Sequence, residues 1–291
     1  MASLKEIRAR IASVSSTQKM TSAMKMVSAA KLHKSEEATL KFVPYKNKLS
    51  DMLTQYLSSV DPEKVNITLA EKREVKRVAI ICISSCTGLC GTFNSNINKL
   101  LEKTLKEYSN LPEKDVLIYP IGKKISDYVK KTNRIAQCSI DELSAKPSYD
   151  GAIEFISPLV DKFLNKEIDK IILLYNHHKN AGVQIPTTET YLPLDTIETK
   201  SSNKSYLYFT EPDIDTFINS LVPMVVRMRF YAALIDSNTA EHGARTTAMQ
   251  IASDNANNML EAITQQYNRA RQEVITNELL DIVGGAEALR S

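Results

Sequence analysis

The stretch that decides the fold is residues 221–274, LVPMVVRMRFYAALIDSNTAEHGARTTAMQIASDNANNMLEAITQQYNRARQEV. Apolar or small residues recur in it at steps of three and four, which is the spacing of one face of an α-helix. The pattern crosses three polar positions and continues, as is typical of a coiled coil. Its members are Leu221, Val225, Met228, Ala232, Ile235, the polar Thr239, His242 and Thr246, and then Met249, Ala252, Ala256, Met259, Ile263, Tyr267, Ala270 and Val274.

The ends of this helix are also indicated by the sequence. Glu211-Pro212-Asp213 is a typical start signal and Gly284-Gly285 a typical stop, and the last proline of the chain is Pro223. A helix of about 70 residues is about 105 Å long at about 1.5 Å per residue. A compact globule of this chain length measures only about 50 Å across. We therefore expect a helix that projects from the rest of the protein.

Residues 3–58 are the expected partner of this helix. One stripe runs along their first turns, and a second stripe follows after a phase slip of the kind that a stutter produces. Pro44 is the interior helix breaker, and we expect it to kink or interrupt the helix. The first stripe is Leu4, Ile7, Ile11 and Val14; the second is Met20, Ala23, Met24, Val27 and Ala30.

The charge of the chain is divided between its two ends. Residues 1–60 hold ten Lys/Arg and four Asp/Glu, whereas residues 236–291 hold four Arg and eight Asp/Glu. Two amphipathic ends of opposite charge, with a domain between them, pair most simply as an antiparallel coiled coil. The alternative is a pair of helices buried in an ordinary α-domain.

The middle of the chain alternates predicted strands and helices, which favours a Rossmann-like α/β domain with a mostly parallel sheet of about five strands. The last two strands are close enough in sequence for an antiparallel hairpin. The predicted strands are residues 75–84, 115–120, 134–140, 169–176 and 183–192, and the predicted domains are residues 1–60, 75–195 and 211–291.

Motifs for chemistry are weak. Gly88-Leu89-Cys90-Gly91 lies between a strand and a helix but matches neither common phosphate-loop pattern, so we interpret it as a tight turn. The spacing of Cys86 and Cys90 does not support zinc. His177 and His178 are adjacent on a strand and point to opposite faces, so we expect them to be solvated. We predict no catalytic, cofactor-binding or metal-binding residue.

Composition excludes several classes of protein. No apolar run reaches the roughly 18–20 residues of a membrane-spanning helix, and the first residues lack the apolar core of a secretory signal. Four Cys in 291 residues favour a reducing compartment over a disulfide scaffold. The basic N-terminal residues alternate with apolar ones, which is more typical of a solvated helix face than of nucleic-acid binding.

Three segments resemble the gamma subunit of F-type ATP synthase. The N-terminal signature is carried by residues 11–14 (IASV) and 17–27 (TQKMTSAMKMV), and the central turn by residues 88–91 with Asn94. The C-terminal signature is carried by Arg271-Gln272, residues 275–279 (ITNEL) and residues 282–286 (IVGGA). The resemblance spans the whole chain in the correct order, and Pro44-Tyr45 matches a break in the family's first helix.

This resemblance implies a central rotor shaft without catalytic residues or cofactors. Its coiled coil would enter the ring of three alpha and three beta subunits, and its α/β domain would sit with epsilon on the membrane-embedded c-ring. Proton flow would turn the shaft and drive ATP synthesis; ATP hydrolysis would turn it in reverse. The location implied is the cytoplasmic side of a bacterial inner membrane, with a mature mitochondrial form as an open alternative.

The resemblance also assigns roles to residues at matching positions. Met24, Lys25, Arg271, Gln272 and Thr276 would contact the beta subunits. An apolar tip that turns in a sleeve would be formed by Ile275, Leu279, Ile282 and Val283.

The chain departs from the family where Cys86 and Thr87 replace the usual Asp and Arg, which puts contacts of that pair at the foot in doubt. A redox role for Cys86 and Cys90 is one hypothesis that follows. Two other functions stay open: a coiled-coil adaptor or tether without a rotary role, and an enzyme that uses the α/β domain to bind a nucleotide.

Overall fold

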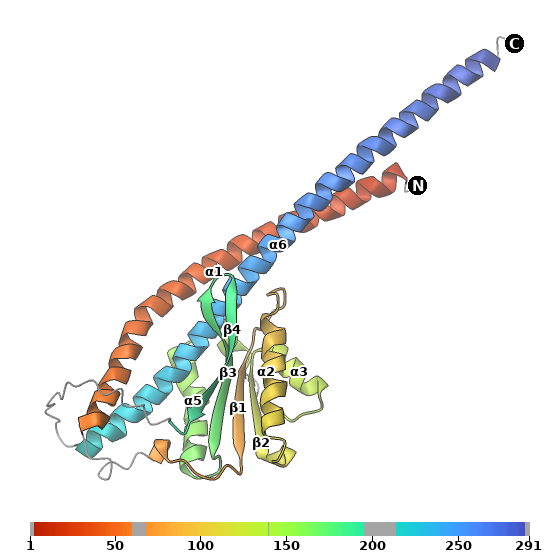
Figure 1. Cartoon of the computed structure of the whole chain (residues 1–291). Helices are drawn as coiled ribbons and strands as arrows, with labels where there is room; N and C mark the ends of the chain where they lie inside the picture. The colour runs from red at the N-terminus through yellow and green to blue at the C-terminus, as the bar shows by residue number, and fades with distance from the viewer. Residues whose placement is uncertain (1–2, 60–67, 139, 195–213, 289–291) are drawn as a thin grey trace. The chain divides into compact units, whose positions relative to one another are not determined.

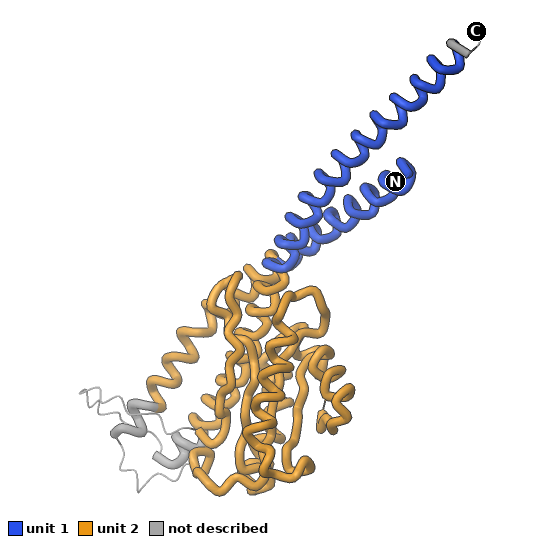
Figure 2. Tube along the Cα trace, turned by 45° about the vertical axis from the view of Figure 1, so that its right-hand side comes forward, with its two compact units in different colours: residues 1–28, 246–291 blue, residues 29–245 orange. Residues whose placement is uncertain are grey.

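The computed structural model describes residues 3–59, 68–138, 140–194 and 214–288. The chain divides into two compact units, which Figure 2 shows in different colours. One unit consists of residues 1–28 and 246–291, and the other of residues 29–245. Residues 195–213, which include the junction between the second and third predicted domains, lie outside the described residues. The division into three domains stays a prediction.

Two long helices dominate the chain, as predicted. Helix α1 is Leu4–Ser59 and helix α6 is Ile214–Ala288. Helix α1 continues through Pro44, so of the two effects expected there, a kink or an interruption, the interruption does not occur. Helix α6 continues past Gly284-Gly285, so the predicted stop is wrong. A Cβ atom added at either glycine would have no atom within 4 Å. No close packing at these positions therefore requires glycine or forces the helix to end there.

The sheet of the larger unit is mostly parallel, as predicted, and has the strand order β2-β1-β3-β4. Strands β1 (Val78–Ile83), β2 (Val116–Ile121) and β3 (Lys170–Asn180) are parallel to one another. Strand β4 (Val183–Leu192) pairs antiparallel with β3, which confirms the predicted hairpin. The near-continuous apolar sequence of β1 agrees with its burial on both faces.

The expected fifth strand is not formed by residues 134–138 and 140, the described part of its range. Only Ala136 and Ile140 make isolated bridges to β2 in the described part of this segment, so the sheet has four strands there rather than about five. Ile135 is largely exposed, so the segment buries too little apolar surface at the sheet edge to complete a ladder.

The two faces of the sheet are covered by different helices (Figure 1). Val78, Ile80 and Cys82 of β1 pack in a cluster with α2 and α3. Ala79 and Ile81 point to the other face, toward α5 and the first part of α6. The helical elements between the long helices are η1 (Thr68–Ala70), α2 (Phe93–Glu107), η2 (Glu113–Asp115), α3 (Lys123–Lys131), α4 (Glu142–Ala145) and α5 (Tyr149–Leu164).

The turn from β2 into α3 requires glycine. Gly122 has a φ of 100°, and an added Cβ would collide with the backbone carbonyl of Ser84. The side chain of Ser84 accepts a hydrogen bond from the backbone NH of Ile125 at 3.0 Å. Glycine therefore allows the close approach of the two strand ends from which α2 and α3 begin.

Candidate functional site: the paired terminal helices and the end of α6

In the smaller unit, residues 4–28 of α1 and α6 from residue 246 to about residue 270 run side by side in opposite directions (Figure 2). The guanidinium of Arg8 donates to the hydroxyl of Tyr267 at 2.8 and 2.6 Å and lies 5.3 Å from the centre of its ring. Met249, Ala256 and Ile263 are buried along the same helix pair. The predicted antiparallel pairing is therefore confirmed in this unit.

The side of α1 that faces its partner differs from the prediction after Val14. Met20 and Val27 are 61% and 57% exposed, and no stutter occurs. Instead, residues with reduced exposure keep strict steps of three and four through Gln18, Thr21, Lys25 and Ser28. Counted from the contact of Arg8 with Tyr267, Gln18 and Thr21 are level with the turns of α6 that hold the buried Ser253 and Ala256, and such small side chains leave little room for methionine. The whole second predicted stripe, which also holds Ala23, Met24 and Ala30, is exposed.

The stripe on α6 is correct except near its end. Met259 is exposed, and the neighbouring Leu260 is partly buried in its place. Val274 is also exposed, and burial along the pair ends at Ala270. The reason is the length of α1, which begins at Leu4, close to the level of Tyr267, and leaves the later turns of α6 without a helix to pack on.

The residues that the resemblance assigned to partner contacts fall on two segments of this unit. Met24 is exposed on α1, and Lys25 is partly buried beside the helix pair. Arg271, Gln272 and Thr276 are exposed on α6. The hydroxyl of Thr276 donates to the backbone oxygen of Gln272 at 2.9 Å, so it is held by its own helix.

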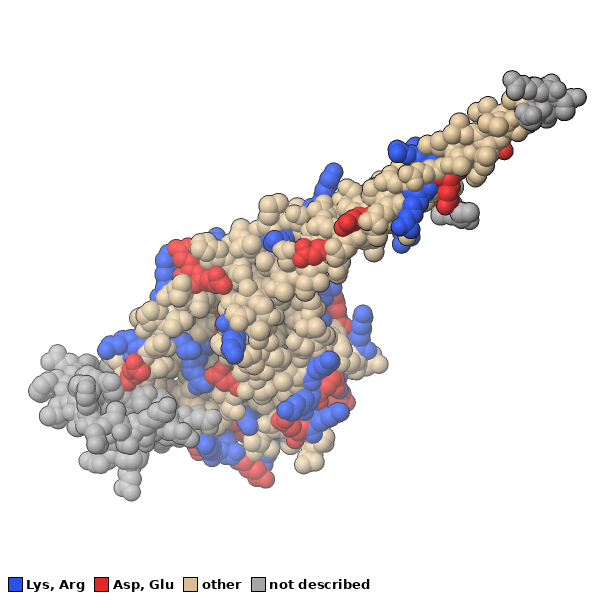
Figure 3. All heavy atoms as spheres, turned by 45° about the horizontal axis from the view of Figure 1, so that its top comes forward, with Lys and Arg blue, Asp and Glu red and all other residues tan. Residues whose placement is uncertain are grey.

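The predicted contact and tip residues of α6 share one side of the helix. At about 100° per residue, Arg271, Gln272, Ile275, Thr276, Leu279, Ile282 and Val283 fall within about 140° of its circumference. Glu273, Glu278 and Asp281 fall on the opposite side. All of these side chains are exposed, and Figure 3 shows few charged atoms near the described end of α6. The last turns of α6 therefore have one weakly charged face and one acidic face.

The central turn is held by polar side chains within the larger unit. Leu89 and Gly91 have φ values of 62° and 59°, as expected for a tight turn. The amide oxygen of Asn94 accepts from the backbone NH of Ser85 at 3.1 Å, so Asn94 closes the turn. The N-cap residue of α2 is Thr92. Arg245 of α6 donates to the hydroxyl of Thr87 at 2.8 Å.

The two cysteines of this turn contact different parts of the unit. The thiol of Cys86 donates to the backbone oxygen of Asp141 at 2.8 Å. Cys90 is buried against Phe93, Ala240 and Ala244, and all four cysteines of the chain are free. These contacts do not support the hypothesis of a redox-active pair.

A charged cluster that was not predicted lies on the α6 side of this turn. Glu241 and Arg245 form a largely buried ion pair at 2.7 Å, and their spacing of four residues on a helix was a readable signal. Burial raises the pKa of Glu241, and the positive charge of Arg245 acts in the opposite direction. The buried imidazole of His242 lies beside this pair in sequence.

The pH dependence of stability provides a test of this cluster. Burial, followed by the positive charges of Arg245 and Lys31, lowers the pKa of His242 from 6.5 to about 4. The unfolded chain therefore binds a proton at this residue more readily than the native state does between these values. We expect the free energy of unfolding to fall as pH falls through this window, because the contribution of neutral His242 is lost.

Urea unfolding at about pH 7 and about pH 4.5 measures this effect. His242→Gln should flatten the dependence, whereas His33→Gln, an exposed position on α1, should leave it unchanged. An equal slope in wild type and His242→Gln would contradict the assignment.

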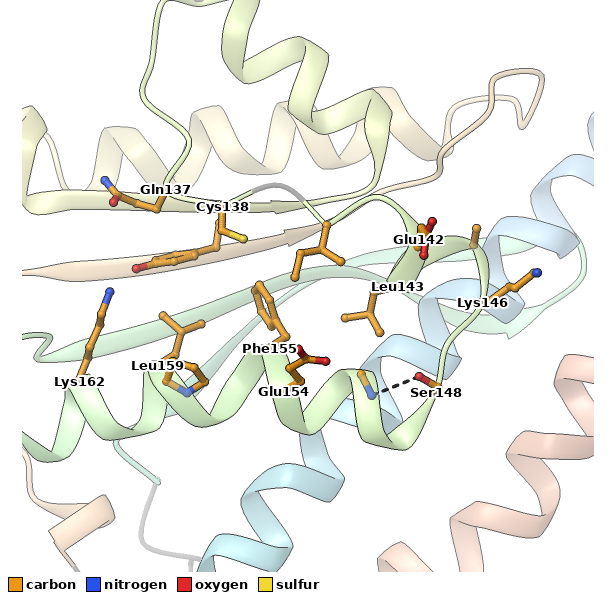
Figure 4. A pocket seen from close by; sticks show the side chains of 15 residues that line it. Gln137, Cys138, Glu142, Leu143, Lys146, Ser148, Glu154, Phe155, Leu159 and Lys162 are labelled. Atoms are coloured by element: carbon orange, nitrogen blue, oxygen red, sulfur yellow. Dashed lines mark hydrogen bonds between the residues drawn. The ribbon is translucent and has the colours of Figure 1, made fainter.

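A groove of about 890 Å³ lies between α5 and residues 137–146 (Figure 4). Leu143, Phe155 and Leu159 point into it, and the charged Lys146 and Lys162 lie toward its two ends. Its polar groups are spread apart rather than convergent, unlike those of a typical substrate site. Across the described ranges, no group of three or more His, Cys, Asp or Glu residues could hold a metal ion. None of the described helices is long and apolar enough to span a bilayer.

The two adjacent histidines are less solvated than predicted. The side chain of His177 is half exposed, but its Nδ1 lies 2.5 Å from a carboxylate oxygen of Asp236. The side chain of His178 is mostly buried, and its Nε2 lies 3.5 Å from Glu36. Contacts between residues so far apart in sequence leave no local signal.

The structure defines the class of this protein as an α/β protein with a long antiparallel pair of terminal helices. A family model described as ATP synthase matches residues 3–289. The ATP synthase gamma chain of Phocaeicola vulgatus is 48% identical over 99% of this chain and 100% of its own length, and that of Bacteroides fragilis strain ATCC 25285 is 47% identical over 99% and 100%. The chain therefore belongs to the ATP synthase gamma chain family.

Solved structures share the fold at low sequence identity. A chain of the Euglena gracilis mitochondrial ATP synthase has a TM-score of 0.67 at 17% identity and covers 98% of this chain and 94% of its own length. A chain from the central stalk and c-ring of the Tetrahymena thermophila enzyme has a TM-score of 0.61 at 22% identity, with 80% and 99% covered.

Proposed function

We propose that this chain is the central rotor shaft of an F-type ATP synthase. In this role it couples proton flow through the membrane sector to conformational cycling of the catalytic beta subunits, and in reverse it couples ATP hydrolysis to proton pumping. The observation that carries the proposal is the similarity to gamma chains over the full length of the chain, at 48% sequence identity to one of them. The paired helices supply the element that such a shaft requires.

The shaft is proposed to act through contacts rather than chemistry. The residues assigned to beta-subunit contact lie on helix surfaces, not around a cavity, and we propose that the chain contributes no catalytic residue. The weakly charged and acidic faces of α6 make its end asymmetric, so three beta subunits around it would each meet a different surface. Different contacts stabilise different conformations, which gives the three sites unequal nucleotide affinities.

The proposed partners are the ring of alpha and beta subunits around the helix pair, and epsilon and the c-ring at the α/β domain. Membrane association is then indirect, through the complex. The proposed location is the cytoplasmic side of a bacterial inner membrane. The proposed domains are residues 1–60 and 211–291, which form the helix pair, and residues 75–195, which form the α/β domain. A mature mitochondrial form remains the alternative location.

Copurification tests the proposed function directly. The tagged full-length chain should purify with a ring of nucleotide-binding subunits, and removal of the chain should abolish the coupling of their ATPase activity to proton pumping. Isolated chain titrated with ATP should show no binding. An adaptor or tether would purify with other partners and leave coupled ATP hydrolysis intact, and an enzyme would bind the nucleotide by itself.

Partner contact by the α6 face predicts a loss in coupled activity. Replacing Arg271 and Gln272 by Ala removes a guanidinium and an amide that would donate hydrogen bonds to the beta subunits. We expect ATP-driven proton pumping of the assembled complex to fall about tenfold, since hydrogen bonds with charged groups contribute about 1.5–3 kcal/mol. Glu273→Ala, on the opposite face, is the matched control and should keep most of the activity.

A further inference from the structure

A second cavity lies inside the larger unit, where α1, the β3–β4 hairpin and α6 meet. Its volume is about 410 Å³, which is within the range of small-molecule sites. Helix α1 lines it with residues between Glu36 and Lys46, and α6 with residues between Arg229 and Thr239. These two segments run antiparallel here, because Thr39 lies 3.4 Å from Thr239 and the rings of Phe42 and Tyr231 are 5.1 Å apart.

The long walls of this cavity are apolar. Leu40 and Val43 line it from α1, and Ala232 and Ile235 line it from α6. The side chain of Leu40 is exposed to solvent, although it belongs to the same cavity wall as other apolar side chains. An apolar molecule between these walls would remove this side chain from water, which is favourable.

The charges of the cavity are separated along its length. Glu36 and Asp236 lie at one end with the two histidines, whereas Lys46 and the Arg229–Glu189 pair lie at the other. On α1, ten residues separate the acidic from the basic position, or about 15 Å at about 1.5 Å per residue. Burial, followed by the charges of Glu189 and Asp236, raises the pKa of Tyr175 in the cavity wall.

Glu36 is the carboxylate at the acidic end with unused acceptor capacity. Asp236 already accepts from the backbone NH of His178 at 3.0 Å and contacts His177 at 2.5 Å. Within the described residues, the contact of Glu36 is one of 3.5 Å with Nε2 of His178, which is longer than an ordinary hydrogen bond. Nδ1 of the same imidazole is buried and has no hydrogen-bond partner in the part of the chain that the structure describes.

We propose that this cavity binds a small organic ammonium ion with an apolar body. The ammonium group donates to Glu36, and the body lies between Leu40 and Val43 of α1 and Ile235 of α6. A ligand in this position touches both α1 and α6 within the larger unit. It therefore stabilises the folded chain by mass action.

The test uses the full-length chain and 4-phenylbutylamine as the probe. We expect saturable binding by isothermal titration calorimetry and a rise in the unfolding temperature with probe concentration. The alcohol 4-phenylbutan-1-ol and the acid 4-phenylbutyrate have a similar apolar body without the ammonium group, and they should bind at least about tenfold more weakly. Equal binding of the three compounds, or no saturable binding of the amine, would overturn the proposal.

Two variants and a matched control locate the binding site. Glu36→Gln should weaken amine binding about tenfold while the chain stays folded. Ala232→Leu should reduce binding by filling the apolar wall. Glu37→Gln is the control, because this neighbouring residue pairs with Lys41 and does not line the cavity. Unchanged binding in Glu36→Gln, or an equal loss in Glu37→Gln, would contradict the assignment.

Discussion

Replacing both Leu279 and Ile282 by Asp is expected to lower ATP-driven proton pumping of the assembled complex at least about tenfold, because a carboxylate in an apolar surrounding loses hydration without a partner. These side chains are 58% and 68% exposed on the chain, so the substitutions should not disturb its own fold. Under the proposed function these side chains lie in an apolar sleeve. The tip can turn there because it forms no strong hydrogen bonds that would hold it at one angle. Pumping by reconstituted vesicles, normalised to the assembled complex, is the measurement.

The matched control adds the same charge to the other face of α6. Val274→Asp with Asn277→Asp places two carboxylates on the side that already carries Glu273, Glu278 and Asp281. That side should tolerate them, so pumping should stay near the wild-type rate. Wild-type pumping in the Leu279/Ile282 variant would remove the support for an apolar bearing, and equal losses in the two variants would contradict a face-specific contact.

Replacing Phe230 by Ala is expected to destabilise the larger unit by about 3–5 kcal/mol, the usual cost of removing a buried aromatic side chain. Phe230 is fully buried and joins three elements: it stacks on Phe155 of α5 at 5.4 Å and meets Tyr191 of β4 edge-on at 6.2 Å. Its loss opens a cavity between α6 and the sheet. Urea unfolding of the full-length chain, followed by tyrosine fluorescence, measures the effect.

Two other substitutions make this prediction specific. Phe230→Leu keeps most of the apolar volume and should cost less than half as much. Met224→Ala removes an exposed side chain from the same helix and should change the free energy of unfolding by no more than about 0.5 kcal/mol. A small effect of Phe230→Ala would mean that α6 is held on the sheet mainly by other contacts, such as the hydrogen bond from Tyr191 to the backbone oxygen of Val226 at 2.7 Å.

The paired helices show how far periodicity alone can be taken. The first stripe, from Leu4 to Val14, was correct because its apolar residues coincide with the helical spacing. Beyond it, two candidate stripes exist on α1, one rich in methionine and one polar. Apolar character favoured the methionine stripe, but the small residues on α6 favour the polar one. The distance between the two helix backbones decides this, and that distance is known only from the packed structure.

The candidate site divides in the same way. The family signatures placed Arg271, Gln272 and the tip residues, and helix geometry alone brings them to one face of α6. In contrast, Glu36, His178 and Asp236 come from three elements, and neither composition nor spacing relates them. The charged pair of Glu241 and Arg245 is intermediate, because its helical spacing was visible although its burial was not.

By itself, the sequence determined two long helices, the parallel order of the central strands and the family, because these depend on periodicity and on motifs local to the chain. Only the tertiary structure decided which face of α1 meets α6, that the sheet has four strands within the described residues, and how the cavity beside Glu36 is formed. The physical reason is that burial and close packing depend on partners distant in sequence, whereas helical and strand periods depend on neighbours.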